Sequence, residues 1–232
     1  MLIEKPMALE ATQVLAVAAA AKKAGRVAAE AFMVSHHPQW QWVKSLLASG
    51  ELGRLYQVSG HFSYFNRKEA DFRNQPAQGG GGLRDVGVYP IITARQALGC
   101  EPTLLAAHME RCPDFATDRY VDFTLDFAGV RGHFYCATQM ERSQQMVFHG
   151  EHGRIVMHAP FNPMDFPQGA RVDVYQQQGR QCQSRFFSDA DHYLNMLDNL
   201  CLHIKGEAEL AVTLDDSAAN QAVVDAIFRA CN

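Results

Sequence analysis

The feature that most constrains the fold is a series of short strand-like runs joined by tight turns. The runs cover residues 103–111, 120–127, 131–139, 145–149, 154–158, 171–177 and 181–187. Glycine lies in the turns at 128–130, 150–153 and 178–180, where it supplies the positive φ that tight hairpins need. Because such turns leave no room for crossover helices, the series predicts a mostly antiparallel sheet. One face of that sheet would be left uncovered by sequence-adjacent helices.

Helical patterns lie on both sides of this series. We expect helices at residues 6–25, 39–48, 85–98, 191–204 and 215–230, and two further strands at 26–34 and 54–65. The second of these strands has one aromatic face, because Tyr56, Phe62 and Tyr64 fall on alternate positions. The expected fold class is therefore α+β, with a large, mostly antiparallel, open-faced sheet and helices on one face.

Composition excludes several functional classes. The 232 residues include 21 Lys and Arg and 25 Asp and Glu, so there is no basic footprint for nucleic acid. No run of apolar residues is long enough to span a membrane, and no secretory leader is recognisable at the N-terminus. The six cysteines are scattered without a C-x-x-C pair, as is typical of thiols in a reducing compartment. We expect a globular cytoplasmic protein.

A glycine-rich stretch at residues 78–92 is the strongest candidate for a functional site. Four consecutive glycines form a loop whose backbone can approach a ligand closely, and a helix is expected to follow from about Leu83. Asp85 and Tyr89 would then stand one turn apart on one helix face, which suits a proton-transfer pair. The alternative is a flexible glycine turn before a surface helix whose Asp favours the positive end of the dipole.

A second short stretch lies at the start of the chain. Lys5 is held between an apolar strand-like run and Pro6, within the sequence Glu4-Lys5-Pro6. These two stretches, in this order, resemble the E-K-P and G-G-G-x-L-x-D-x-G-x-Y/H motifs of the Gfo/Idh/MocA oxidoreductase family. Matching stretches at residues 30–33 and 50–53 extend the resemblance over nearly the whole chain. Tyr rather than His at position 89 is similar to the branch that holds dimeric dihydrodiol dehydrogenases and xylose dehydrogenases.

The resemblance implies an NAD(P)-dependent oxidoreductase that moves a hydride between nicotinamide and a small polyol, sugar or dihydrodiol. The substrate hydroxyl must lose its proton in the same event, and Tyr89 is the candidate base, with Lys5 lowering its pKa. Asp85 would orient either the substrate or the Lys5 ammonium, or would merely cap a helix. Arg73 resembles a substrate-binding arginine of the family, and its alternative is a solvated loop charge. Glu4, Lys5 and Pro6 would lie against NAD or NADP.

The chain departs from the family in one large respect. It contains no G-x-G-x-x-G, the turn that holds a dinucleotide in a Rossmann domain. We therefore expect a truncated member in which residues 1–34 keep the last helix and strand of that domain. Residues 35–232 would form the substrate-binding and oligomerisation domain. Such a chain would bind NAD(P) poorly and be inactive in isolation. The alternative is a non-catalytic, ligand-binding or scaffold remnant.

Two further expectations concern metals and assembly. His36 and His37 are adjacent and have no third ligand at suitable spacing, so no metal site is expected. The strands at 120–127 and 132–138 carry apolar or aromatic residues on both faces. An uncovered face of that kind predicts a homodimer or higher homo-oligomer through the open sheet. The competing arrangement would place the last two helices on opposite faces and leave a monomer.

Overall fold

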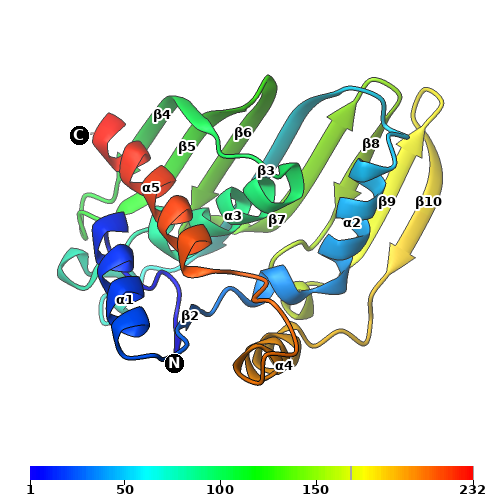
Figure 1. Cartoon of the computed structure of the whole chain (residues 1–232). Helices are drawn as coiled ribbons and strands as arrows, with labels where there is room; N and C mark the ends of the chain where they lie inside the picture. Colours follow the sequence, from blue (N-terminus) through cyan, green and yellow to red (C-terminus); the bar gives the residue numbers. More distant parts are fainter. Residues whose placement is uncertain (168, 232) are drawn as a thin grey trace.

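The computed structural model describes residues 1–167 and 169–231. Its centre is an eight-stranded sheet in the order β10-β9-β8-β7-β3-β6-β5-β4 (Figure 1). The strands are β3 (Leu55–Phe65), β4 (Thr103–Arg111), β5 (Asp118–Phe127), β6 (Val130–Ala137), β7 (Gln139–Gly150), β8 (Gly153–Met157), β9 (Arg171–Gln176) and β10 (Arg180–Phe186). Every pairing is antiparallel except that of β3 with β6. The prediction of a mostly antiparallel sheet is confirmed.

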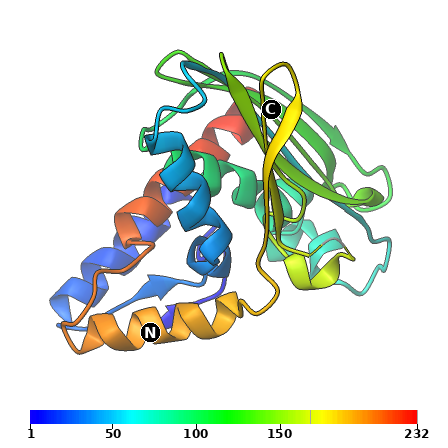
Figure 2. The same cartoon turned by 90° about the vertical axis from the view of Figure 1, so that its right-hand side faces the viewer.

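The five α-helices of the described residues lie on one side of this sheet (Figures 1 and 2). They are α1 (Ala11–Lys23), α2 (Pro38–Ala48), α3 (Val88–Leu98), α4 (His192–Ile204) and α5 (Leu214–Ala230). The open-faced architecture is thus confirmed, and the arrangement that splits the last two helices between the two faces is wrong. No helix in the described ranges could cross a membrane.

The core lies between the sheet and the helices. Alternation along β5 turns Val121, Phe123, Leu125 and Phe127 inward, and all four are buried. Each such side chain contributes roughly 1.5–3 kcal/mol through burial. On the helix side, the Trp40 indole donates a hydrogen bond to the Pro160 carbonyl over 3.0 Å. The sheet and the helices therefore share one buried core.

The first thirty residues differ in detail from the expectation. The first helix begins at Ala11 and not at Pro6, because Glu10 forms a capping box with Gln13. The strand expected at 26–34 shrinks to β2 (Ala29–Glu30), which pairs in parallel with β1 (Leu2–Ile3). A short 3₁₀ turn (Met33–His36) follows it. The division between residues 1–34 and 35–232 remains a prediction.

The glycine stretch also has an unexpected local form. A π-helical turn (Leu83–Gly87) precedes α3. In such a turn a backbone N–H bonds to the carbonyl five residues earlier, and not four as in an α-helix. A side chain at Gly87 would collide with Leu83 and Cys136, at 2.8 and 2.9 Å. Glycine here lets the turn pack closely on β6. Such single π turns often occur at functional sites.

Candidate functional site

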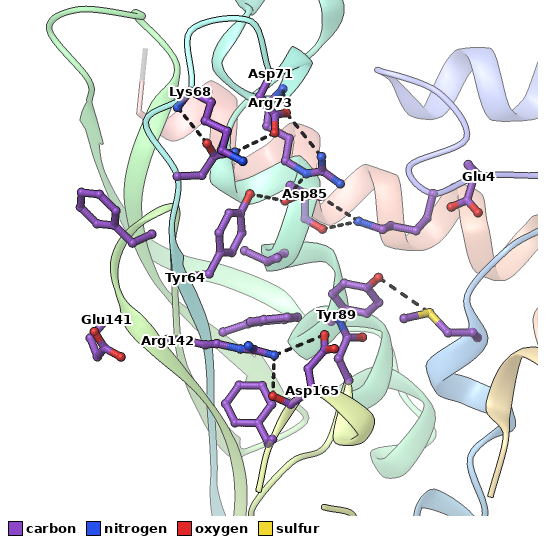
Figure 3. Close-up of a pocket in the computed structure, with 18 of the residues that line it drawn as sticks. Glu4, Tyr64, Lys68, Asp71, Arg73, Asp85, Tyr89, Glu141, Arg142 and Asp165 are labelled. Carbon is purple, nitrogen blue, oxygen red and sulfur yellow. Dashed lines mark hydrogen bonds and ion pairs between the residues drawn. The ribbon is translucent and has the colours of Figure 1, made fainter.

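A cavity of about 1040 Å³ opens on the helix side of the sheet, next to the π turn. Its walls come from the start of the chain, the end of β3 and the loop after it, the π turn and α3, the strand β7, the loop before β9, and the start of α4. Figure 3 shows Asp85 between Tyr64 and Arg73 on one wall, and Arg142 with Asp165 on another. The cavity therefore gathers side chains that are far apart in sequence.

Asp85 is the centre of the polar network. Lys5 Nζ donates to its carboxylate over 3.1 Å and to its backbone carbonyl over 2.6 Å. The Tyr64 hydroxyl and Arg73 Nε donate to the other carboxylate oxygen over 2.5 and 3.1 Å. Burial alone would raise the pKa of Asp85, but Lys5, the Tyr64 hydrogen bond and Arg73 together hold it below its usual range. The side chain is thus an anion held by three donors, and it is not a helix cap.

Tyr89 lies beside this network in an apolar setting. Its side chain is 4% exposed and its ring stacks on Phe161 at 5.7 Å. Lys5 Nζ sits over the face of the ring, 4.9 Å from the centroid, while the hydroxyl donates to Met33 Sδ over 3.7 Å. Burial, then the Asp85 charge, raise the pKa of Tyr89 well above its ordinary value. The expectation that Lys5 lowers this pKa is wrong, because the ammonium lies over the ring and not against the hydroxyl.

The four glycines were expected to bring the backbone close to a ligand, but they do not line the cavity. They lie close to other parts of the chain instead. A side chain at Gly80 would lie 2.5 Å from the Arg73 carbonyl, and one at Gly81 would lie 1.9 Å from Asp118 Oδ1. The alternative prediction of a surface helix is also wrong, because Tyr89 is buried and the Asp85 side chain is only 12% exposed. The glycines therefore allow the loop to pack closely on the backbone of Arg73 and on the Asp118 side chain.

The structure brings together most of the residues singled out from the sequence. Lys5, Asp85, Tyr89 and Arg73 all line the cavity, and Glu4 lies at its exposed edge. Pro6 is not among the lining residues, and the Lys5–Pro6 peptide bond is cis. Contact with a ligand remains a prediction for every one of these residues.

Sequence reasoning missed Tyr64, Arg142 and Asp165. Tyr64 lies two residues after Phe62, on the aromatic side of β3, and that alternation was its only signal. Burial and the Asp85 carboxylate raise the pKa of Tyr64 far above its ordinary value. Arg142 donates to the Asp165 carbonyl over 2.6 Å and stacks on Phe166 at 4.6 Å. The contacts of these residues join segments that are far apart in sequence, and local patterns do not reveal them.

The N-terminus of α1 does not fit the pyrophosphate of a dinucleotide. An anion of that kind needs free backbone donors at a helix N-terminus. At α1, the Glu10 side chain closes a capping box and the Ala11 amide donates to Asp225 Oδ2 over 2.9 Å. Two carboxylates at that terminus would repel phosphate. Among the residues with described positions, no group of three or more His, Cys, Asp or Glu could hold a metal ion.

Comparison with known proteins places this geometry in a family. Residues 40–156 match the GFO/IDH/MocA C-terminal domain. An uncharacterized oxidoreductase, ORF334 of Rhizobium meliloti, is 29% identical over 98% of this chain and 69% of its own length. The dTDP-3,4-didehydro-2,6-dideoxy-alpha-D-glucose 3-reductase of Streptomyces antibioticus is 32% identical over 76% of this chain, which spans 54% of that enzyme.

A solved structure gives the same result. KijD10, a 3-ketoreductase from Actinomadura kijaniata in complex with NADP and TDP-benzene, superposes with a TM-score of 0.89 at 25% identity. The match covers 100% of this chain and 70% of that one. The chain therefore belongs to the GFO/IDH/MocA family of oxidoreductases, as its two motifs predict.

Proposed function

We propose that this chain carries the substrate-binding and proton-transferring residues of an NAD(P)-dependent oxidoreductase that acts on a small sugar, polyol or dihydrodiol. The observation that supports this most directly is the meeting of Lys5, Asp85 and Tyr89 at one cavity. Among relatives with related activities is a D-xylose 1-dehydrogenase (NADP(+)) of Haloferax volcanii, 28% identical over 98% of this chain.

The solved relatives add a second line of support. KijD10 structures include one variant in which a lysine is replaced by alanine and another in which a tyrosine is replaced by phenylalanine. The separation of those two positions along that chain equals the separation of Lys5 and Tyr89 here. We assign Lys5 and Tyr89 as the catalytic pair on this basis together with their geometry.

Each residue of the pair has a definite task. An ammonium has three N–H donors, and Lys5 directs two of its contacts to the carbonyl and carboxylate of Asp85. The third donor has no hydrogen-bond acceptor among the described residues, so it can bind the oxygen of a substrate carbonyl or hydroxyl. Tyr89 is a neutral phenol at pH 7, so it gives its proton to that oxygen during reduction. Its present acceptor, a thioether, is weak and easily replaced by a substrate oxygen.

The remaining wall suits a polyhydroxylated substrate. Asp85 holds Lys5 in place, and Arg73 and Tyr64 hold Asp85. The cavity also presents the amides of Asn66 and Asn162 and the rings of Phe166 and Tyr193. Amide groups can both donate to and accept from hydroxyls, while aromatic faces cover the apolar C–H side of a sugar ring.

The nicotinamide of NAD or NADP supplies or accepts the hydride when it is bound. Because the sequence has no G-x-G-x-x-G and carboxylates occupy the N-terminus of α1, we expect the chain alone to bind NAD(P) with no useful affinity. The same observation favours the second candidate function, a ligand-binding chain of this fold without catalysis. Both functions use the same cavity and differ only in whether a nucleotide is engaged.

Saturation-transfer NMR with D-xylose, D-glucose and glycerol tests the cavity directly. We expect a sugar signal that is lost in Lys5→Met and retained in the matched control Lys22→Met, an exposed lysine of α1. Equal signals in both variants would refute the assignment of Lys5. Protection against heat by NADPH separates the two functions, since ligand at a hundred times its dissociation constant adds about 2.7 kcal/mol. Protection supports the oxidoreductase, and sugar binding without it supports the ligand-binding chain.

We further propose that the uncovered sheet face pairs with the same face of a second copy. That face is more polar than the strand pattern suggested. Tyr135 stacks on His61 at 4.7 Å and on Tyr120 at 6.0 Å, and Asp122 and Thr124 lie nearby. Tyrosine-rich surfaces of mixed polarity are common at interfaces between subunits. Light scattering at micromolar concentration decides the point, and a single species of 25.8 kDa would refute the dimer.

A further inference from the structure

Asp118 is a buried carboxylate that lies behind the glycine stretch. It is the first residue of β5, its side chain is 2% exposed, and it does not line the cavity. One carboxylate oxygen accepts a hydrogen bond from the Leu83 amide over 2.6 Å. Leu83 is the first residue of the π turn that carries Asp85. The carboxylate therefore holds the start of that turn.

The same carboxylate also presses against the glycines. Gly81 has a φ of 125°, and a side chain there would lie 1.9 Å from Asp118 Oδ1. The Gly81 carbonyl in turn accepts the Asp85 amide hydrogen over 3.1 Å. Asp118 thus contacts both residues that fix the backbone of Asp85, one by a hydrogen bond and one by close packing.

We propose that Asp118 is a positioning residue that sets the place of the Asp85 carboxylate, and through it the Lys5 ammonium. The proposal deepens the function proposed above and rests on it for its catalytic meaning. Its geometric content stands alone, because the path from Asp118 through Leu83 and Gly81 to Asp85 consists of contacts within the chain. Lys5 then receives its position from the Asp85 carbonyl and carboxylate.

The surroundings of Asp118 make this link sensitive to pH. Burial raises the pKa of Asp118 to about 6, against the opposing effects of the Leu83 hydrogen bond and of Arg84 and Arg111. Two thiols, Cys136 and Cys231, also lie within its electrostatic reach. A carboxylate is a stronger acceptor for an amide hydrogen than a neutral carboxyl group. Protonation near pH 6 would therefore loosen the contact with Leu83 and change the setting of Asp85.

Tyr64 provides a reporter that needs no ligand. Its hydroxyl donates to Asp85 over 2.5 Å, so the ¹³Cζ resonance of labelled tyrosine follows the position of that carboxylate. The Tyr64 signal is assigned by its disappearance in Tyr64→Phe. We expect this signal to titrate with a midpoint near pH 6 in the unaltered chain. In Asp118→Asn, which keeps the shape and removes the charge, it should be displaced and should no longer titrate there.

Asp122→Asn is the matched control. It makes the same isosteric change on the same strand, at a half-exposed carboxylate that pairs with His108. The Tyr64 resonance and its titration should be unchanged in this variant. If Asp118→Asn leaves the resonance in place, or if it retains the same midpoint, the proposal is overturned.

A binding measurement connects the inference to function. With D-xylose as the probe, we expect Asp118→Asn to weaken binding about five-fold, as a change in one charged hydrogen bond behind the site would. Displacement of the Tyr64 signal without any sugar binding to the unaltered chain would uphold the positioning role and sink the proposed function. Five-fold weaker binding with an unmoved Tyr64 signal would refute the positioning role and leave the function intact.

Discussion

Asp85 and Asp173 are both buried carboxylates with several donors, yet they serve different ends. Asp85 is bound by Lys5, Tyr64 and Arg73, which lie in three separate parts of the chain. Asp173, on β9, is fully buried and accepts from side chains of its own hairpin and the neighbouring strand. These donors are His158, Arg171, Tyr175, Gln181 and Ser184. In both cases the partners outweigh burial and hold the carboxyl pKa below its usual range.

The two carboxylates differ in their access to a cavity. Asp85 and its partner Lys5 border the large cavity, and the Lys5 ammonium there has a third N–H donor for a ligand. Asp173 lines none of the cavities described above. A dense network around a buried charge therefore does not identify a functional site. The network at Asp173 ties together three strands at one end of the sheet. The network at Asp85 holds an ammonium where a ligand can reach it.

The largest expected effect is on stability at Asp173. Asp173→Asn should lower the free energy of unfolding by about 3 kcal/mol, because removing one member of a buried ionic network leaves its partners unsatisfied. Asp85→Asn should cost less, about 1–2 kcal/mol, because Lys5 borders the open cavity, where water can solvate its ammonium, and the asparagine amide oxygen still accepts a hydrogen bond. Urea unfolding of both variants tests this. Equal losses would erase the distinction between the two carboxylates.

Ligand binding should show the reverse order. Asp85→Asn is expected to weaken sugar binding roughly 30-fold, about 2 kcal/mol, because Lys5 loses a charge-assisted hydrogen bond that fixes it. Asp173→Asn should leave the dissociation constant within about two-fold, as mutations at distant sites act independently. Calorimetric titration with the sugar that binds best supplies both numbers. A large loss of affinity at Asp173 would contradict the division of roles.

The sequence predicted the site around Asp85, but it did not predict the network around Asp173. The strand series and its glycine turns predicted the sheet, because hairpin pairing is local. Each strand from β4 to β10 overlaps one of the predicted strand-like runs. The two motifs predicted that Lys5, Asp85 and Tyr89 meet. Asp173 gave no signal, because its burial depends on the register of β8, β9 and β10. The pKa of Tyr89 was predicted in the wrong direction, since sequence does not show which part of a ring faces a cation.

As the pH falls, two histidines should lose their contribution to stability before Asp85 and Asp173 do. The rings of His37 and His192 are buried with their centroids 5.6 Å apart, and burial lowers the pKa of each to about 4. A histidine whose pKa is depressed on folding stabilises the protein above pH 6.5, and that stability is lost as pH falls toward 4. The carboxylates lose their contribution only below their ordinary pKa, near 3.8. Asp118 opposes the histidines, since its raised pKa favours the folded state at low pH.

The free energy of unfolding should therefore fall by about 2 kcal/mol between pH 7 and pH 5. Thermal unfolding at several pH values measures it. His192→Asn should flatten the dependence, while His108→Asn, at an exposed position on β4, should not. A dependence that persists unchanged in His192→Asn would assign the acid sensitivity elsewhere.

The smallest expected effect separates direct from indirect contact at the cavity. Arg73 binds Asp85 through Nε and Asp71 through a second nitrogen 3.4 Å away, and its guanidinium stacks on Phe72 at 4.5 Å. Arg73→Lys keeps the charge and loses this planar arrangement. If Arg73 only supports Asp85, sugar affinity should fall about two- to three-fold, as befits an ion pair that is partly exposed to water. A loss of ten-fold or more would mean that the guanidinium binds the ligand itself. Arg73 would then stand with Lys5 as a binding residue, and the support of Asp85 would be left to Tyr64 and Asp118.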